Sequence, residues 1–193
     1  MSEPTKPRVV VLVGSTRPER QGPTVARWVI EHLATQRDFD AELIDLADVG
    51  LPLLDEPNPA RKRQYVHEHT KRWSSIVDAA DGFVLVTPEH NRSMPASVKN
   101  ALDCLYWEWQ HKPLGFVSYS TGIFGGVRAV ESVRQVAVTL SLIPLNAMVN
   151  LPRIHTLVVD GELNPPPDAV DALAGLTTDL IAHLGASAVL RRR

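Results

Sequence analysis

The sequence has one cysteine, Cys104, among 193 residues, which excludes an internal disulfide and any site built from several thiolates. Its longest uninterrupted apolar run, residues 9–13, is far shorter than the roughly 20 residues of a membrane-spanning helix. Charge of one sign is also lacking: 20 Lys and Arg against 22 Asp and Glu give a net charge of −2, which argues against a nucleic-acid partner. The amino-terminal residues contain two prolines and no apolar signal core. We therefore expect a cytoplasmic, soluble protein with no membrane segment and no metal site.

Short apolar runs alternate with helical patterns along the whole chain. Runs rich in β-branched residues predict strands, and nearly continuous runs are typical of parallel strands buried on both faces. These strands are predicted at 8–13, 41–46, 82–87, 114–119 and 146–151, with 41–46 at an edge. Three-to-four spacing of apolar residues predicts helices at 24–36, 61–80, 95–105, 126–141 and 168–184. Repeated strand–helix alternation predicts a doubly wound parallel sheet with helices on both faces.

The same patterns predict the domain organisation. No internal repeat or low-complexity linker divides the chain, so we expect a single domain spanning residues 1–193. The ends, 1–6 and 188–193, are predicted to be flexible. Asp160-Gly161 between two short apolar pairs predicts a small hairpin near the last helix.

The loop after the first predicted strand has the composition of an anion site. Its sequence from Gly14 to Thr24 is Gly-Ser-Thr-Arg-Pro-Glu-Arg-Gln-Gly-Pro-Thr, and it leads directly into a helix. Hydroxyls, guanidinium groups and the free N–H groups of a helix start all favour a phosphate. The alternative is that Ser, Thr and Pro only cap the helix.

Two familiar phosphate motifs do not fit this loop. A nucleoside-triphosphate loop needs Gly-Lys-Ser/Thr, and residues 14–24 contain no lysine. A dinucleotide fingerprint needs three close glycines, whereas Gly14 and Gly22 are widely separated. Asp45, at the end of the second strand, is therefore interpreted as structural rather than as a ribose ligand.

Two later loops complete the predicted site. Residues 87–95 (Thr-Pro-Glu-His-Asn-Arg-Ser-Met-Pro) follow the third strand, and the glycine-rich residues 120–126 follow the fourth. Ligands of open α/β sheets bind outside the carboxyl ends of the strands, where these loops meet. Together the three loops predict a phosphorylated planar cofactor.

These loops resemble those of the NAD(P)H-dependent FMN reductases of the flavodoxin-like superfamily. Gly14-Ser-Thr-Arg17 resembles the family's phosphate loop, and residues 87–103, with Lys99-Asn-Ala-Leu-Asp103, follow its Pro-Glu-Tyr-Asn…Leu-Lys-Asn-Ala-Ile-Asp pattern. The resemblance implies a flavodoxin-like five-stranded parallel sheet in the order 2-1-3-4-5 and FMN as cofactor. It also implies a homodimer or homotetramer.

Carried over by position, the resemblance implies three groups of FMN-binding residues. The phosphate group is Ser15, Arg17, Gln21, Gly22 and Thr24. The group along the ring and ribityl chain is Pro88, Glu89, His90 and Asn91, and the group at the ring's pyrimidine end is Ser120, Thr121, Gly122 and Gly125. Two residues depart from the family pattern: His90 stands where an aromatic Tyr or Trp is usual, and Arg92 stands where Gly is usual.

The resemblance implies hydride transfer from NAD(P)H to FMN, then electron transfer to a small acceptor such as a quinone, a free flavin, an azo compound or a metal oxyanion. FMN supplies this chemistry, so no catalytic side chain is predicted. Arg17, Arg20 or Arg92 is a candidate for the 2′-phosphate of NADPH. The alternatives are a flavodoxin-type electron carrier without nicotinamide activity and a non-catalytic binder of a phosphorylated ligand.

Three other features receive structural interpretations. His67 and His69 are two residues apart on a predicted helix, and are read as solvated surface rather than a metal pair. Cys104 is read as a small buried hydrophobe. The aromatic-rich residues 106–109 are predicted to end the helix at 95–105 and to form a subunit interface, with core packing as the alternative.

Overall fold

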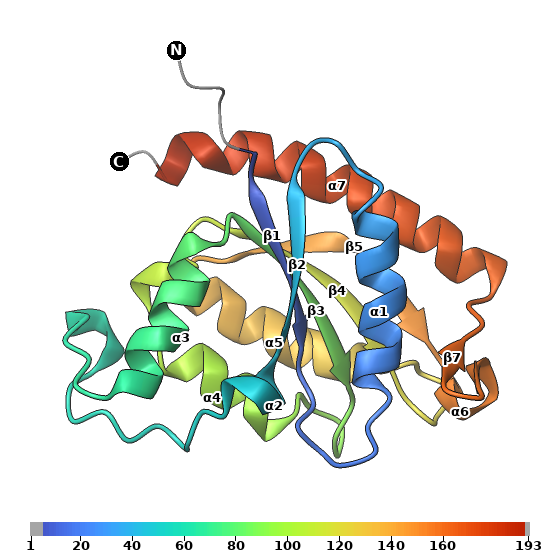
Figure 1. The fold of residues 1–193 in the computed structure, drawn as a ribbon, viewed down its shortest axis with the longest axis horizontal. Coiled ribbons are helices and arrows are strands. Elements are labelled where there is room, and N and C mark those ends of the chain that lie inside the picture. Colours follow the sequence, from blue (N-terminus) through green and yellow to red (C-terminus); the bar gives the residue numbers. More distant parts are fainter. Residues whose placement is uncertain (1–5, 192–193) are drawn as a thin grey trace.

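The computed structural model of the protein describes residues 6–191 (Figure 1). In chain order its elements are β1 (Arg8–Val13), α1 (Gly22–Leu33), β2 (Asp40–Asp45), α2 (Leu46–Val49), η1 (Ala60–Lys62), α3 (Glu68–Ala79), β3 (Gly82–Pro88), α4 (Ala96–Asp103), η2 (Trp107–Trp109), β4 (Pro113–Tyr119), α5 (Val127–Thr139), β5 (Ile143–Leu151), α6 (Ile154–Leu157), β6 (Val158–Val159), β7 (Glu162–Leu163) and α7 (Pro167–Arg191). The five predicted strands and five predicted long helices are all present.

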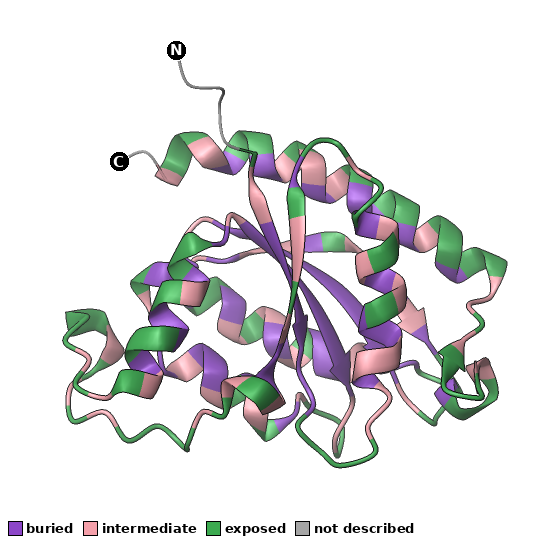
Figure 2. Cartoon of the chain, viewed as in Figure 1, coloured by how far each residue is buried: buried purple, intermediate pink, exposed green. Residues whose placement is uncertain are grey.

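The central sheet has the order β2-β1-β3-β4-β5, and every pair of neighbouring strands is parallel. Both β3 and β4 are buried along their whole length, whereas β2 is partly exposed at the sheet edge (Figure 2). The fully apolar runs therefore form the middle of the sheet, as expected for strands covered on two faces. The predicted flavodoxin-like fold class is confirmed.

The helices form two layers, one on each face of the sheet. Alternate β1 side chains divide between them, because successive strand residues point to opposite faces. Val9, Val11 and Val13 pack in the core that contains α1 and α7, whereas Val10 and Leu12 pack in the core that contains α3, α4 and α5. This arrangement leaves the two ends of the strands uncovered by helices.

The last helix, α7, is longer than predicted. Residues 188–191, expected to be flexible, continue the helix, and Arg191 forms a 3.0 Å ion pair with Asp81. By length and composition α7 is apolar enough to cross a bilayer, since an 18-residue window of it has a mean hydropathy of 1.4, but its buried leucines pack in the core beside β4 and β5. We interpret it as a covering helix of the sheet. Residues 1–5 and 192–193 of the predicted flexible ends lie outside the described residues.

Helix α3 begins at Glu68 rather than near Arg61. The Glu56 carboxylate accepts the backbone N–H groups of Val66 and His67 at 2.8 and 3.0 Å, and His67 is extended. These bonds hold the preceding residues outside the helix. The short hairpin of β6 and β7 forms where Asp160-Gly161 predicted it.

Candidate active site

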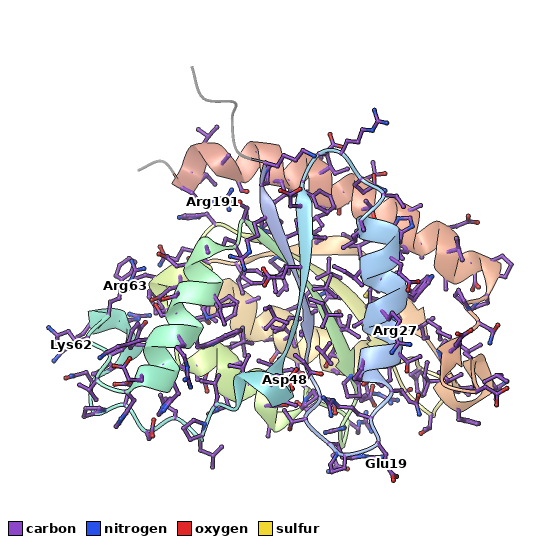
Figure 3. All side chains as sticks on the ribbon, viewed as in Figure 1. Glu19, Arg27, Asp48, Lys62, Arg63 and Arg191 are labelled. Atoms are coloured by element: carbon purple, nitrogen blue, oxygen red, sulfur yellow. The ribbon has the colours of Figure 1, made fainter. Side chains whose placement is uncertain are left out.

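Three loops meet at the carboxyl ends of the central strands. Strand order reverses between β1 and β3, so the loops that follow these strands leave the sheet on opposite sides and open a crevice. In Figure 1 the loops after β1 and β3 lie side by side below the sheet, and Figure 3 places Glu19 at the tip of the first. The fold thus creates the crevice where the sequence predicted a ligand.

A cavity of about 250 Å³ lies in this crevice. Its lining includes most of the predicted cofactor residues, from all three loops: Ser15, Arg17, Gln21, Pro88, Glu89, His90, Ser120 and Thr121. Five further residues line it: Glu19, Arg20, Tyr119, Ile154 and His155. The topology therefore brings together side chains more than a hundred residues apart.

The other predicted cofactor residues lie close by but do not line the cavity. The Thr24 hydroxyl donates to the Gly161 carbonyl at 3.3 Å, toward the β6–β7 hairpin. Asn91 is exposed in the turn after β3. The Gly122 carbonyl accepts the Arg153 N–H at 3.1 Å, and the Gly125 carbonyl accepts the Ser118 hydroxyl at 2.7 Å. Gly22 begins α1 beneath the cavity.

The first turn of α1 lacks a side-chain cap. Gln21 occupies the N-cap position without capping, so the first N–H groups of the helix receive no side-chain acceptor. Arg20 forms a 2.7 Å ion pair with Asp45, which also caps α2 by accepting the Ala47 N–H at 2.9 Å. Asp45 is therefore structural, as interpreted. An uncapped helix start beside arginines is an anion site by its dipole and its free donors.

Two buried donors at this helix start have no partner among the described residues. They are the Tyr119 hydroxyl and the Arg20 Nε–H, and both residues line the cavity. Tyr119 is 5% exposed, and burial raises the pKa of its phenol, so the hydroxyl remains a donor at neutral pH. A side chain at Gly22 would approach this hydroxyl to 3.0 Å, so glycine keeps the space open. Both groups can donate a hydrogen bond, as an acceptor-only group requires, and the residues fit the phosphate of a mononucleotide.

An ion pair ties the loop after β3 to the helix after β4. Glu89 accepts the backbone N–H of Arg128 at 3.3 Å and its guanidinium at 3.1 Å. The guanidinium also lies 4.0 Å from the centre of the Phe124 ring. Gly126 precedes α5 with φ of 87°, where a Cβ would come within 2.9 Å of the Tyr119 carbonyl oxygen. The two loops predicted to flank a planar ring are thus fixed to one another.

The remaining predictions have mixed outcomes. Cys104 is buried, and burial raises the pKa of its thiol to about 11, as expected for a small hydrophobe. His67 and His69 do not lie on one helix as predicted: His67 precedes α3, and its ring stacks on that of His69 with the centroids 5.2 Å apart. Among residues 6–191, no group of three or more His, Cys, Asp and Glu side chains has the arrangement of a metal site.

The aromatic segment is divided between core and surface. It forms a separate turn, η2, rather than the end of α4. Trp109 is buried, whereas Trp107 is 49% exposed and donates its indole N–H to the Arg61 carbonyl at 2.6 Å. Core packing, the alternative interpretation, thus applies to Trp109.

Sequence reasoning missed Tyr119, Ile154 and His155. Tyr119 ends a strand whose residues are all buried, so it resembles an ordinary core residue. Ile154 and His155 belong to the four-residue helix α6, which has no detectable periodicity. One signal was available for Tyr119: it is the last residue of a central strand, where ligand contacts concentrate.

Comparison with known families agrees with this geometry. The family model described as NADPH-dependent FMN reductase matches residues 7–156. The chain belongs to this family. The predicted FMN-dependent NAD(P)H oxidoreductase, with FMN as its cofactor, is therefore confirmed at the level of the family.

Individual relatives carry related names. An NAD(P)H-dependent FMN reductase of Schizosaccharomyces pombe is 42% identical over 163 residues, covering 82% of this chain and 80% of the relative. An NADPH azoreductase of a Bacillus species is 33% identical over 178 residues, covering 92% of both chains. A quinone reductase of Pseudomonas putida is 37% identical over 139 residues, covering 69% and 71%.

A solved structure matches the fold. The flavoenzyme NAD(P)H:(acceptor) oxidoreductase FerB of Paracoccus denitrificans has a TM-score of 0.73 at 21% identity, covering 94% of this chain and 98% of its own. This match shows the shared architecture of the two proteins.

Proposed function

We propose that this protein binds FMN in the cavity at the carboxyl ends of the central strands (the carboxyl edge) and catalyses the reduction of a small acceptor by NAD(P)H. The observation that carries the proposal is the pair of buried, unpartnered donors of Tyr119 and Arg20 beside the uncapped start of α1. We assign the FMN phosphate to this position, with Ser15, Arg17 and Gln21 around it. Pro88, Glu89, His90 and Ser120, from the loops after β3 and β4, would hold the ring, in one flavodoxin-like domain.

Bound in this cavity, FMN would supply the two-electron chemistry that links hydride donation by NAD(P)H to reduction of the acceptor. The protein's part is to bind and orient. Arg17 would balance phosphate charge, the unpartnered Arg20 Nε–H would donate to the phosphate, and the Glu89–Arg128 ion pair fixes the spacing of the two ring-contacting loops. The backbone N–H groups of Glu89, Asn91 and residues 121–126 are proposed to stabilise negative charge on the cofactor, because those of His90 and Ser120 donate to the Ser93 and Leu151 carbonyls and Pro88 has none. No side chain is assigned an acid or base role.

The proposed acceptors are quinones and azo compounds, because relatives with these names cover at least two thirds of the chain. In the quinone reaction, NAD(P)H and one proton yield NAD(P)⁺ and the hydroquinone. Free flavins and metal oxyanions remain candidates to be assayed beside them. We also propose a cytoplasmic location, which cell fractionation tests.

We further propose that the protein forms a homodimer or homotetramer through the face near α4. Leu53 is 79% and Leu54 50% exposed beside α4, and Trp107 of the aromatic segment is 49% exposed. Asn100 fixes the leucine loop by donating to the Pro52 carbonyl at 2.7 Å and accepting the Leu54 N–H at 2.9 Å. Sedimentation of a compact monomer at micromolar concentration would contradict this proposal.

The decisive experiment is spectroscopic. The purified protein is loaded with FMN, made anaerobic and mixed with NADPH or NADH, followed by benzoquinone. Bleaching of the 450 nm region and its recovery on adding the quinone are expected. A protein that binds FMN but is not bleached by either nucleotide would be a flavodoxin-type carrier. One that takes up no FMN would be a binder of another phosphorylated ligand.

A further inference from the structure

The turn after β3 contains an arginine in an unfavourable backbone conformation. His90 and Ser93 exchange both backbone hydrogen bonds, at 2.9 and 3.0 Å, around Asn91 and Arg92. The two central residues have φ of 49° and 68°, so both are left-handed, as in a type I′ turn. Asparagine tolerates this conformation and glycine prefers it, whereas arginine is disfavoured. This explains why the family pattern has glycine where this chain has Arg92.

Nothing within the described residues compensates for this strain. Arg92 is exposed, and its side chain forms no hydrogen bond or ion pair with residues 6–191. Arg63 provides the contrast: it is also left-handed, with φ of 52°, but its guanidinium pairs with Asp78 and Glu108 at 3.0 and 3.2 Å. The cost at Arg63 is offset by ion pairs inside the chain. No ion pair among residues 6–191 offsets the backbone strain at Arg92. This difference points to a ligand outside the chain.

The position of Arg92 limits what that ligand is. The turn follows directly on Pro88, Glu89 and His90, which line the cavity, so Arg92 stands at its rim. Two nearby arginines are already engaged, Arg20 with Asp45 and Arg128 with Glu89. Arg17 lines the cavity itself, where the FMN phosphate is assigned. Among residues 6–191, Arg92 is therefore an uncommitted cation on the β3 side of the entrance.

We infer that Arg92 binds the 2′-phosphate of NADPH and makes the protein prefer NADPH over NADH. The inference rests on the proposed function, because it assumes that the nicotinamide nucleotide enters this cavity. A 2′-phosphate is a dianion that only NADPH carries, and arginine binds phosphate through paired, charge-assisted hydrogen bonds. The inference selects Arg92 from the three candidates for this phosphate, which were Arg17, Arg20 and Arg92.

The test uses Arg92→Gly, whose effects on stability and binding should have opposite signs. Removing the strained side chain should raise Tm by about 2–4 °C. The KM for NADPH should rise about tenfold with kcat unchanged, and the KM for NADH should not move. Titration calorimetry supplies a readout independent of turnover: 2′,5′-ADP should bind the wild-type protein about tenfold more tightly than Arg92→Gly, and 5′-AMP should bind both equally.

Three variants separate strain, charge and position. Arg92→Asn keeps a residue suited to the turn but loses the cation, so it should behave like Arg92→Gly in NADPH binding. Arg92→Lys should restore part of the preference. Arg37→Gln removes an exposed positive charge from the loop between α1 and β2 and should leave both KM values unchanged.

Two outcomes would overturn the inference while leaving the proposed function intact. One is a wild-type protein that oxidises NADPH and NADH with equal KM. The other concerns Arg153, which is exposed, left-handed with φ of 50° and adjacent to cavity-lining Ile154. If Arg153→Gln raises the NADPH KM and Arg92→Gly does not, the phosphate site lies there instead. If neither nucleotide bleaches the flavin, the proposed function itself fails.

Discussion

A polar cavity lies at each end of the strands: one at their amino ends (the amino edge) and one at their carboxyl ends (the carboxyl edge). The smaller of the two, at the carboxyl edge, is the candidate active site. The cavity at the amino edge is about 540 Å³ and is lined by Arg63, Asp78, Glu108, Lys112 and Arg191, against about 250 Å³ at the carboxyl edge. Figure 3 shows Arg191 and Glu19 at opposite ends of the sheet. Volume and charge therefore do not distinguish a ligand site in this molecule.

The difference lies in hydrogen-bond partners. At the amino edge the charged groups are paired within the chain. Arg191 binds Asp81, the Lys112 ammonium donates to the Val77 and Asp78 carbonyls at 2.6 and 3.0 Å, and buried Glu108 accepts from several donors. At the carboxyl edge, buried donors of Tyr119 and Arg20 have no such partner among residues 6–191. A buried donor costs stability unless something accepts from it, so unpaired donors that line a cavity indicate a ligand site.

The largest expected effect is loss of stability at the amino edge. Glu108 accepts hydrogen bonds from the Ser74 hydroxyl at 2.7 Å and the Tyr65 hydroxyl at 3.0 Å, besides its ion pair with Arg63. Glu108→Ala leaves these donors unpaired and should lower the free energy of unfolding by about 3–5 kcal/mol, measured by urea denaturation.

The control for this variant is Glu131→Ala, because the Glu131 side chain is 63% exposed in its pair with Arg134. Its effect should stay within about 0.5 kcal/mol. Glu108→Ala should also leave the ratio of FMN to riboflavin affinity unchanged. A changed ratio would mean that the two edges are not independent.

The next effect concerns pH. Burial lowers the pKa of Lys112 to about 8 from its usual 10.5, against the opposing influence of Asp78. The native amine thus releases its proton before the unfolded one, and its contribution to stability, complete above pH 10.5, is lost as pH falls to 8. Relative to Lys112→Met, the wild-type protein should gain about 3 kcal/mol between these pH values. Parallel pH profiles in urea denaturation would contradict this.

The sequence alone predicts the buried strands and the position of the site. The runs of Val and Leu in β1, β3 and β4 identify buried strands, because apolar continuity is required for burial on both faces. Strand order follows from the resemblance, and the position of the site follows from where the loops fall. Local sequence was therefore sufficient for the strands, and the resemblance was needed for their order.

Pairings between distant residues could not be predicted. Arg20 and Asp45 are separated in the chain and meet only because β1 and β2 are neighbours. Tyr119 reads as a core residue until α1 is placed above it. The predicted start of α3 is wrong because Glu56, eleven residues before His67, accepts the His67 N–H and keeps His67 outside the helix. Each depends on tertiary contacts that composition and periodicity do not encode.

The third prediction tests the unpaired donors directly. Tyr119→Phe removes the buried hydroxyl and keeps the ring. FMN affinity, measured by quenching of flavin fluorescence, should fall about tenfold, and riboflavin affinity should not change because riboflavin lacks the phosphate. Stability without FMN should stay level or increase, since an unpaired buried group is removed. Equal losses for FMN and riboflavin would contradict a phosphate contact.

The smallest effect is expected at the ion pair between the ring-contacting loops. Glu89→Gln or Arg128→Met should weaken FMN and riboflavin equally, by about threefold to fivefold, because the pair positions the ring side of the cavity rather than the phosphate. The double variant should be no weaker than either single one, since each change breaks the same interaction. Additive losses in this cycle would show that the two residues act separately. Equal loss of both flavins here, with selective loss of FMN in Tyr119→Phe, would divide the carboxyl edge into a phosphate end and a ring end.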